Sequence, residues 1–354
     1  MRRWYKITGR VVIKTILVTG GAGYIGSHIC VELLQAGYDV VVADNLSNSV
    51  KTAVDRVEKI TGKTVEFHQV DVRDKAAITE IFGQYSIDAV IHMAGLKAVG
   101  ESCAKPLMYY QNNLNSSMVL FDVMQNFSVN KIVFSSSATV YGDPDTVPIT
   151  EDFPLRVMNP YGRTKYMVEE MLRDITAASS MQAVLLRYFN PIGAHESGMI
   201  GEDPHGIPNN LLPYIAQVAI GHRESLSVFG GDYPTPDGTG VRDYIHVVDL
   251  AKGHVKAIER MAEIETEQGQ CLTYNLGTGR GSSVIEVINA FEQACGHSIK
   301  YDVVGKRPGD VAEYYANPQL ANDEMGWHAE RSLDDMMVDT WRWQTQNPKG
   351  YKGD

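Results

Sequence analysis

A tyrosine and a lysine that lie four positions apart are the first candidates for chemistry. They belong to the segment Tyr161-Gly162-Arg163-Thr164-Lys165, and on a helix this spacing puts both side chains on one face. A free phenol has a pKa of about 10, so a phenolic base at neutral pH needs a nearby positive charge that stabilises its ionised form. The pair therefore predicts that Tyr161 acts as a general base and that Lys165 lowers its pKa.

Three serines upstream supply a hydroxyl for the same chemistry. Ser135-Ser136-Ser137 ends a strand-length run, and we expect Ser137 to hydrogen-bond the reacting substrate oxygen and to share its proton with Tyr161. In isolation, a Tyr-x-x-x-Lys spacing is typical of a surface pair on a helix, and strand-end serines often cap loops. The helix-start signal Asn159-Pro160 directly before the tyrosine favours the catalytic interpretation.

A glycine-rich turn indicates a dinucleotide site. The apolar run Ile16-Leu17-Val18-Thr19 breaks into the segment Gly20 to Gly26, and helical periodicity follows. Glycines at positions 20, 23 and 26 allow a sharp turn, a close approach of the backbone to a pyrophosphate, and tight packing of the helix on the strand. The start of that helix offers free N–H groups to the phosphates.

Two aspartates at strand ends refine the cofactor prediction. Asp44 ends the second predicted strand, where a carboxylate can accept hydrogen bonds from the adenosine ribose and would repel a 2′-phosphate. No lysine or arginine follows it until Lys51, which favours NAD over NADP. Asp71, after the third predicted strand, is placed to reach the adenine edge. Either aspartate could instead only cap its loop.

These candidates need a scaffold of alternating strands and helices. In the first half of the chain, apolar runs of strand length alternate with helix-length periodic segments, which is typical of repeated βα units. We therefore predict an α/β fold with a Rossmann-type doubly wound parallel sheet. Strands are expected at residues 15–19, 39–43, 65–70, 89–93, 131–135 and 183–188, with helices at 25–35, 52–60, 76–82, 107–126 and 162–177.

The pattern changes after Phe189-Asn190-Pro191, where stretches rich in glycine and proline begin. We predict an NAD-binding domain over residues 14–190, a smaller mixed α/β substrate-binding domain over 191–354, and an N-terminal arm with little order over 1–13. Helices are expected here at 210–220, 248–262, 284–294 and 333–346, and strands at 226–229 and 272–275.

Composition excludes several classes of partner. The 354 residues include 32 basic and 43 acidic side chains, a net charge of -11, so neither nucleic acid nor a membrane surface is an expected partner. No run approaches the roughly 20 apolar residues of a membrane span. The four cysteines are far apart and show no metal-ligand spacing, so we expect buried thiols, no metal, and a reducing cytoplasm.

From about Thr15 to Tyr351 the sequence resembles the UDP-glucose 4-epimerases, a family of extended short-chain dehydrogenases/reductases. The glycine turn and the Tyr-x-x-x-Lys pair are common to all extended short-chain enzymes. Four longer strings are more specific: AGLKAVGES at 94–102, SSSATVYG at 135–142, LRYFNP at 186–191 and GVRDYIHV at 240–247.

The resemblance implies the ligands and the residues that hold them. The cofactor would be NAD and the substrates UDP-glucose and UDP-galactose, in a homodimer built on the long helices at 107–126 and 162–177. The implied cofactor residues, besides the three glycines, are Tyr24, Ile25, Asp44, Asn45, Asp71, Val72, Lys97, Asn112, Tyr161, Lys165 and Phe189. The implied substrate residues are Ser137, Asn190, Asn210, Leu211, Phe229, Arg242, Arg307, Asp310 and Tyr314.

The implied reaction is a reversible oxidation at C4 of the sugar through a 4-keto intermediate, with Tyr161 as base. Arg242 and Arg307 are forked donors suited to a diphosphate. The resemblance also places Tyr314 beside the hexose, where a bulky ring would leave little room for a 2-acetamido group.

Two other interpretations stay open on the sequence. The first is another sugar-nucleotide enzyme on the same fold, such as a 4,6-dehydratase, a decarboxylase or a different epimerase. A dehydratase needs an Asp-Glu pair at the strand end, where this chain has Ser137-Ala138-Thr139. The second is a protein that binds NAD without catalysis, although the tyrosine, lysine and serine are all present.

Overall fold

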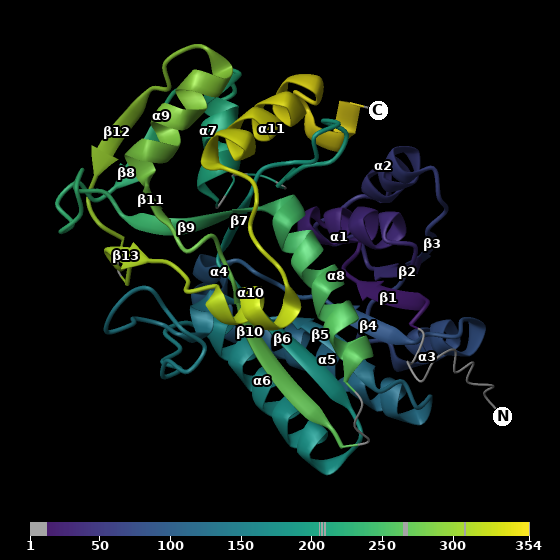
Figure 1. Ribbon diagram of the computed structural model, residues 1–354. Coiled ribbons are helices and arrows are strands. Elements are labelled where there is room, and N and C mark those ends of the chain that lie inside the picture. Colours follow the sequence, from purple (N-terminus) through teal and green to yellow (C-terminus); the bar gives the residue numbers. More distant parts are fainter. Residues whose placement is uncertain are drawn as a thin grey trace.

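A seven-stranded sheet forms the centre of the larger part of the molecule (Figure 1). The computed structural model describes residues 13–204, 206, 208, 210–264, 268–307 and 309–353, so all of the predicted N-terminal arm except Ile13 lies outside the described residues. From edge to edge the strands are β10 (Gln270–Leu276), β6 (Gln182–Tyr188), β5 (Lys131–Ser135), β4 (Ala89–His92), β1 (Thr15–Thr19), β2 (Asp39–Asp44) and β3 (Glu66–Gln69).

All six neighbouring pairs of this sheet are parallel. The strand order reverses between β1 and β4, the point at which doubly wound folds bind ligands beyond the carboxyl ends of the strands. The predicted fold class is therefore confirmed.

Alternating side chains along each central strand pack on opposite faces of the sheet. Ile16 and Val18 belong to one hydrophobic cluster, whereas Leu17 between them belongs to another. Successive side chains of a strand point to opposite faces, and both faces of a parallel sheet are covered by helices. This is why the central strands are apolar throughout instead of alternating with polar residues.

Two sets of helices cover the two faces (Figure 1). The first set packs on one face with Ile16 and Val18, and the second packs on the other with Leu17. The first set consists of α1 (Tyr24–Gln35), α2 (Lys51–Thr61), α8 (Val247–Glu263) and α10 (Gln319–Met325). The second consists of α3 (Lys75–Gln84), α5 (Pro106–Asn126) and α6 (Pro160–Ala178).

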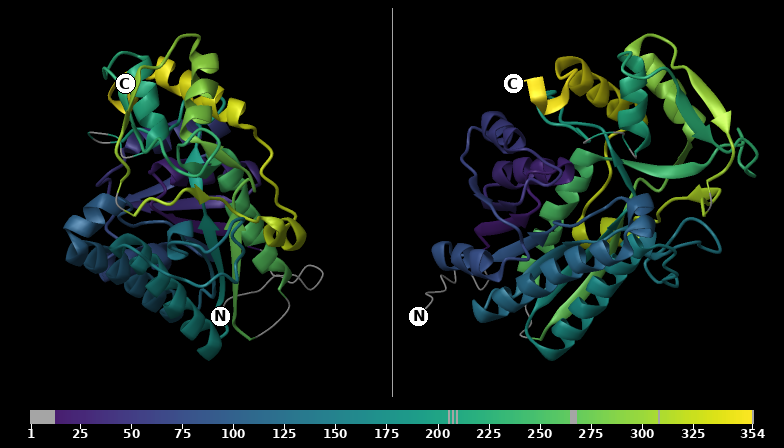
Figure 2. Two further views of the ribbon diagram at one scale, coloured as in Figure 1. Left: turned by 90° about the vertical axis from the view of Figure 1, so that its left-hand side faces the viewer. Right: turned by 180° about the vertical axis from the view of Figure 1, so that it is seen from behind.

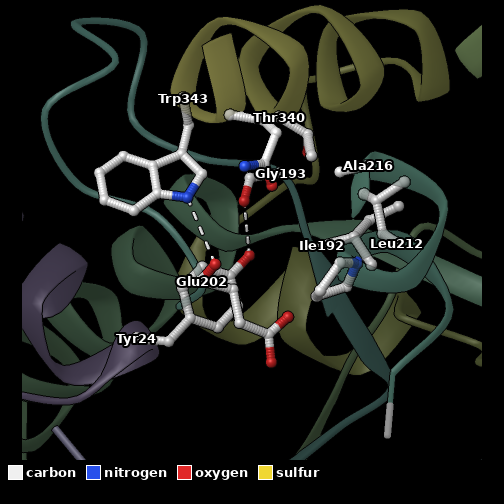
Figure 3. A pocket seen from close by; sticks show the side chains of 10 residues that line it. Tyr24, Ile192, Gly193, Glu202, Leu212, Ala216, Thr340 and Trp343 are labelled. Atoms are coloured by element: carbon white, nitrogen blue, oxygen red, sulfur yellow. Dashed lines mark hydrogen bonds between the residues drawn. The ribbon is translucent and has the colours of Figure 1, made fainter. Parts of the chain in front are cut away.

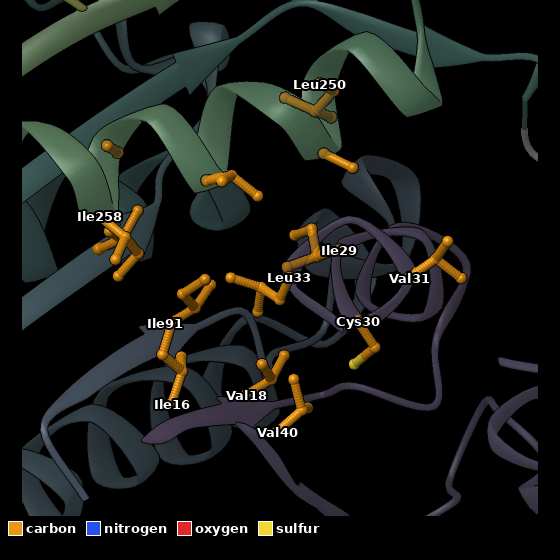
Figure 4. Packing of buried hydrophobic residues seen from close by; sticks show 14 of the residues in the cluster. Ile16, Val18, Ile29, Cys30, Val31, Leu33, Val40, Ile91, Leu250 and Ile258 are labelled. Atoms are coloured by element: carbon orange, nitrogen blue, oxygen red, sulfur yellow. The ribbon is translucent and has the colours of Figure 1, made fainter. Parts of the chain in front are cut away.

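Two elements from beyond residue 190 return to the large sheet. Strand β10 pairs with β6 along its whole length, and α8 packs against α1 (Figure 4). Leu250 and Ile258 on α8 lie in the same cluster as Ile29 and Leu33 on α1. The division into domains at residue 190 stays a prediction, but the large sheet includes a strand from beyond that residue. The sequence could not show this, because hydrophobic periodicity identifies a strand without identifying its partner.

The smaller part of the molecule is mixed and lies beyond the carboxyl edge of the large sheet (Figure 2). In one group of strands, β9 (Val241–His246) pairs with each of three short strands. These are β7 (Asn190–Ile192), β11 (Gly281–Ser283) and β13 (Glu313–Tyr314). Strands β8 (Leu226–Phe229) and β12 (Tyr301–Val304) form a separate pair. The helices here are α7 (Leu211–Ala219), α9 (Val284–Cys295) and α11 (Leu333–Gln346), and they share one hydrophobic cluster.

Every strand and helix expected from the sequence is present, with ends that differ by two residues at most. The short elements were not predicted: α4 (Val99–Ala104), α10, β7, β9, β11, β12, β13 and the single turns η1 (Ala138–Val140) and η2 (Gly350–Gly353). Most of these segments are too short to show a period, and β9 (VRDYIH) and β12 (YDVV) carry charged residues that interrupt an apolar run. The four cysteines are unpaired, but the expectation that all are buried holds only for Cys30: Cys271 and Cys295 are half-buried, and Cys103 lies exposed on the short helix α4. None of the described helices is long and apolar enough to cross a bilayer.

The contact between α8 and the large sheet leads to a stability prediction. Replacing the fully buried Ile258 with alanine should lower the free energy of unfolding by about 2 to 5 kcal/mol, because it removes apolar contacts and leaves a cavity. Urea denaturation measures this change. Val338 on α11 is 43% exposed, so Val338→Ala is the matched control, with an expected loss within about 0.5 kcal/mol. Equal losses in the two variants would contradict the packing described.

Candidate active site

The glycine turn after β1 forms a cradle that side chains would fill. Gly20 has φ +76°, and its N–H donates to the carbonyl of Ala43 at 2.8 Å. A Cβ atom on Gly26 would lie 2.2 Å from the carbonyl oxygen of Gly20, which is far inside contact distance. At the start of α1, Gly23 provides no side-chain cap. The turn therefore presents backbone N–H groups and the positive end of a helix dipole, as a pyrophosphate site requires.

Asp44 holds this turn from the neighbouring strand. Its carboxylate accepts hydrogen bonds from the N–H of Ala22 at 3.0 Å, the N–H of Leu46 at 2.9 Å and the hydroxyl of Ser49 at 2.9 Å. The loop-capping interpretation is therefore part of what Asp44 does. Its contact with a ribose stays a prediction.

Asp71 and Asn45 lie together at the next strand ends. The side-chain amide of Asn45 donates to Asp71 at 3.1 Å, and Arg73 binds the same carboxylate through two nitrogens, at 2.9 and 2.7 Å. The Arg73 guanidinium holds the pKa of Asp71 well below its usual range. Arg73 was not predicted, although its position two residues after Asp71 was visible in the sequence.

Helix α6 places the predicted catalytic pair. The side chain of Asn159 caps the helix by accepting from the N–H of Gly162 at 2.8 Å, and Pro160 occupies the first turn. Tyr161 and Lys165 are both 7% exposed on the inward face of α6. The ammonium of Lys165 donates to the carbonyl of Ser135 at 2.7 Å and lies 6.0 Å from the centroid of the Tyr161 ring.

Ser137 completes the group. Its hydroxyl oxygen accepts from the hydroxyl of Thr139 at 2.9 Å and is hydrogen-bonded to Tyr161. The structure thus brings Ser137, Tyr161 and Lys165 together at the carboxyl end of β5. Thr139, which orients the serine hydroxyl, was not predicted as a site residue.

The protein's own groups do not acidify Tyr161. Burial raises the pKa of Tyr161 to about 12, and the hydrogen bond with Ser137 only partly offsets this. The predicted lowering of this pKa by Lys165 stays a prediction, since the Lys165 ammonium is directed at the Ser135 carbonyl and the cost of burying a phenolate dominates here. Burial also lowers the pKa of Lys165 to about 8. A phenolate at neutral pH needs a further positive charge nearby.

Strand β9 brings together four of the nine predicted substrate residues: Asn190, Arg242, Asp310 and Tyr314. Asn190 on β7 pairs with the second half of β9, and Tyr314 on β13 lies opposite Arg242. The guanidinium of Arg242 is 3.5 Å from the carboxylate of Asp310. A cation–π contact connects β8 with the chain after β12: the Arg307 guanidinium lies 3.7 Å from the centroid of the Phe229 ring.

Tyr314 connects this group to the catalytic segment. Its hydroxyl donates to the carbonyl of Ala138 at 2.5 Å, directly after Ser137. Its ring packs against Phe189 with centroids 5.5 Å apart. The ring of Tyr314 is therefore held at both ends, between the predicted cofactor residue Phe189 and the backbone of Ala138.

Lys97 and Asn210, by contrast, meet a residue that was not predicted. Both contact the carboxylate of Glu202, Lys97 at 3.4 Å and Asn210 at 2.7 Å. Asn112 donates to Asn113 at 3.1 Å, and it is Asn113 that binds the backbone of Leu96. No local signal in the sequence marks Glu202 or Asn113, because their partners are distant along the chain.

The side chains of the remaining predicted residues mainly pack against or bond to other parts of the protein. Ile25 and Val72 pack in the two hydrophobic clusters of the large sheet, and Leu211 begins α7. Tyr24 donates its hydroxyl to the carbonyl of Gly193 at 2.7 Å and lines a cavity of about 10 Å³, room for about one water molecule (Figure 3). None of the three catalytic candidates lines this cavity. Within the described residues, no group of histidine, cysteine, aspartate and glutamate could hold a metal ion.

Comparison with known proteins confirms the resemblance. Residues 17–340 match the family described as GDP-mannose 4,6 dehydratase. A UDP-glucose 4-epimerase of Bacillus subtilis is 59% identical over 338 residues, 95% of this chain and 98% of that protein.

Two solved structures are also similar. The UDP-glucose 4-epimerase from Bifidobacterium longum in complex with NAD+ and UDP has a TM-score of 0.91 at 56% identity, over 95% of this chain and 100% of that one. The enzyme from Stenotrophomonas maltophila, with bound NAD and formylated UDP-arabinopyranose, has a TM-score of 0.92 at 49% identity, over 95% and 99%.

The cradle at Gly26 leads to a binding prediction. In Gly26→Ala the added methyl group would collide with the carbonyl of Gly20, so we expect NAD affinity to fall by more than about tenfold, or about 1.4 kcal/mol. Quantifying the dinucleotide released from purified, acid-denatured protein measures this loss. A Cβ on Gly83 in α3 would meet no atom within 4 Å, so Gly83→Ala should retain the cofactor. Normal NAD content in Gly26→Ala would refute the assignment of the cradle.

Proposed function

Because the chain belongs to the UDP-glucose 4-epimerase family of extended short-chain dehydrogenases/reductases, we propose that it interconverts UDP-glucose and UDP-galactose. The reaction is a reversible, NAD-dependent oxidation at C4 of the sugar through a 4-keto intermediate. The observation that carries this proposal is the meeting of Ser137, Tyr161 and Lys165 at the end of β5, at the same edge of the parallel sheet as the glycine cradle after β1.

The residues around the cradle fit NAD. Other backbone atoms lie so close to Gly20 and Gly26 that neither position can carry a side chain, and the turn stays open for a pyrophosphate. The carboxylate of Asp44 lies beside this turn. Lys97, Asn112 and Phe189 would complete the site. When bound, NAD+ supplies the hydride acceptor and a positive ring charge near the tyrosine.

Tyr161 then moves one proton in each direction. Its phenolate takes the proton of the sugar 4-hydroxyl as that carbon is oxidised, while the hydroxyl of Ser137 bonds the same oxygen. The ammonium of Lys165 helps to hold the phenolate, because opposite charge in a buried site favours the ionised form. Tyr161 returns the proton to the same oxygen when the ketone is reduced on its other face, so C4 is inverted and the cofactor is restored.

The nucleotide must stay anchored while the keto-sugar turns. Arg242 and Arg307 are the proposed partners of the diphosphate, since forked guanidinium groups bind phosphates through paired hydrogen bonds. Asn190, Asn210, Leu211, Phe229 and Asp310 are proposed to line the rest of the UDP-sugar site. Only the hexose needs freedom to rotate about its link to the diphosphate.

A dehydratase is the less favoured alternative. Elimination of water needs an additional acid and base near the strand end, yet residues 135–141 carry only serine, alanine, threonine, valine and tyrosine. A protein that binds NAD without catalysis would not need the buried Lys165 and its bond to the Ser135 carbonyl.

Assembly and location complete the proposal. Leu107 is 66% exposed and Met118 47% exposed on α5, and Met167 is 40% exposed on the adjacent α6, so we propose that these two helices form a homodimer interface. The unpaired cysteines are consistent with work in the reducing cytoplasm.

A direct assay tests the reaction. The purified protein, with no NAD added, should convert UDP-galactose to UDP-glucose, because the cofactor is restored in every cycle. Tyr161→Phe should lower kcat by about 100- to 10,000-fold, the usual contribution of a general base. Chromatography of the nucleotide sugars measures both rates and separates UDP-glucose from a dehydrated keto-sugar.

The controls for that assay are chosen on the same helix. Tyr166, a half-buried neighbour on α6, should tolerate Tyr166→Phe with near-normal kcat. Tyr161→Phe should still contain NAD. If Tyr161→Phe turned over at a near-normal rate, Tyr161 could not be the base.

Substrate range provides a further prediction. The doubly held ring of Tyr314 should exclude a 2-acetamido group, so kcat/KM for UDP-N-acetylglucosamine should be at least about tenfold below that for UDP-glucose. Tyr314→Phe keeps the ring and should keep the discrimination, whereas Tyr314→Ala should relax it. Efficient turnover of the N-acetyl sugar by the unmutated protein would overturn this role.

A further inference from the structure

A buried glutamate follows the catalytic pair along α6. Tyr161, Lys165 and Glu169 are spaced four residues apart, so their side chains lie on one face of the helix. Glu169 is 0% exposed, and it touches neither Tyr161 nor Lys165 by a hydrogen bond or ion pair among those described. Its carboxylate instead reaches the strand end that carries the serines.

The carboxylate of Glu169 has two main partners. One oxygen accepts from the hydroxyl of Ser136 at 2.6 Å and from Nε of Arg187 at 3.0 Å. The other accepts from Nη2 of Arg187 at 2.6 Å. Arg173 lies 3.5 Å from the same carboxylate at the edge of the site.

Ser136 is the middle residue of the catalytic segment. On one side of it, the carbonyl of Ser135 accepts from the ammonium of Lys165 at 2.7 Å. On the other side, Ser137 carries the hydroxyl that bonds Tyr161. The bond between Ser136 and Glu169 therefore fixes the backbone from which both catalytic contacts are made.

The far side of Arg187 is also fully bonded. It donates to the hydroxyl of Tyr141 at 3.0 Å and to the carbonyl of Glu151 at 3.1 Å, and Tyr141 donates in turn to Asn275 at 2.7 Å. A buried ion pair by itself often adds little stability over a hydrophobic pair of similar size. The bond to Ser136 is a contribution that no hydrophobic pair could supply.

We propose that Glu169 is a positioning residue of this reaction: through Ser136 its carboxylate fixes the segment that holds Lys165 by one carbonyl and presents the hydroxyl of Ser137. The inference rests on the proposed function. Glu169 does not touch the sugar or the cofactor in this role. It sets where the serine hydroxyl and the lysine ammonium stand.

The charge of Glu169 adds an effect that can be measured separately. Burial lowers the pKa of Lys165 to about 8, and the negative charge of Glu169 opposes that shift. His92 on β4 is buried with its pKa lowered to about 3, so it is neutral and does not compete. Among the described residues, the other titratable or charged groups around Lys165 and Glu169 include Tyr161 and Arg173 on α6, Tyr188 and Arg187 on β6, His254 on α8, Cys271 on β10 and Tyr141 after η1.

Ser136→Ala tests the positioning role without unpairing Arg187. We expect kcat for UDP-galactose to fall by about ten- to a hundredfold, because a misplaced catalytic group is costly even at small displacements. KM and NAD content should change much less than kcat, because most residues proposed to hold the substrate and NAD lie outside residues 135–137. Ser116 on α5 is also buried and donates within its own helix at 3.1 Å, so Ser116→Ala is the matched control with normal kcat.

Glu169→Gln tests the charge by a readout that a purely structural role would not move. Without the carboxylate, Lys165 should lose its proton at lower pH, so the alkaline limb of the kcat profile should shift to lower pH. Glu169→Asp keeps the charge and should keep the limb while kcat still falls. If Glu169→Gln does not fold, Glu169→Asp and Ser136→Ala still decide the question.

The outcomes separate this inference from the proposed function. Normal kcat in Ser136→Ala, or an unmoved alkaline limb in folded Glu169→Gln, would overturn the role of Glu169 while the unmutated enzyme remains an epimerase. An unmutated protein that leaves UDP-galactose unchanged would overturn the proposed function and this inference with it.

Discussion

The parallel direction of all seven strands of the large sheet is the constraint on which the site depends. Because parallel strands end at the same edge, residues that are more than a hundred positions apart in sequence meet there. The glycine turn follows β1, Asp44 ends β2, the serines end β5 and Phe189 follows β6. A pyrophosphate needs backbone N–H groups, and this edge provides them at the uncapped start of α1.

Burial decides the electrostatics of the catalytic group. It opposes ionisation of both Tyr161 and Lys165, raising one pKa and lowering the other. Each group has a fixed partner: the Lys165 ammonium binds the carbonyl of Ser135, and the Tyr161 phenol bonds the hydroxyl of Ser137. One turn further along the helix, the carboxylate of Glu169 binds Ser136. Bound NAD+ would add a positive charge that favours the ionised form of Tyr161.

Contacts across the two parts of the molecule connect binding to chemistry. Tyr314, on a strand beside Arg242, bonds the backbone next to Ser137, and Tyr24 at the start of α1 bonds the carbonyl of Gly193. Lys97 meets Glu202 in a similar way. Through the Tyr314 bond, the strand beside Arg242 is held against the segment that carries Ser137, the predicted catalytic serine.

Local signals in the sequence determined the long helices and strands, the glycine turn, the cap of α6 and the shared face of Tyr161 and Lys165. Each of these depends on residues within a few positions of one another. Only the tertiary structure decided that β10 joins the large sheet, that Glu202 takes Lys97 and Asn210, that Glu169 holds Ser136, and that burial raises the pKa of Tyr161. These features depend on distances and desolvation between segments far apart in the chain, which no local spacing records.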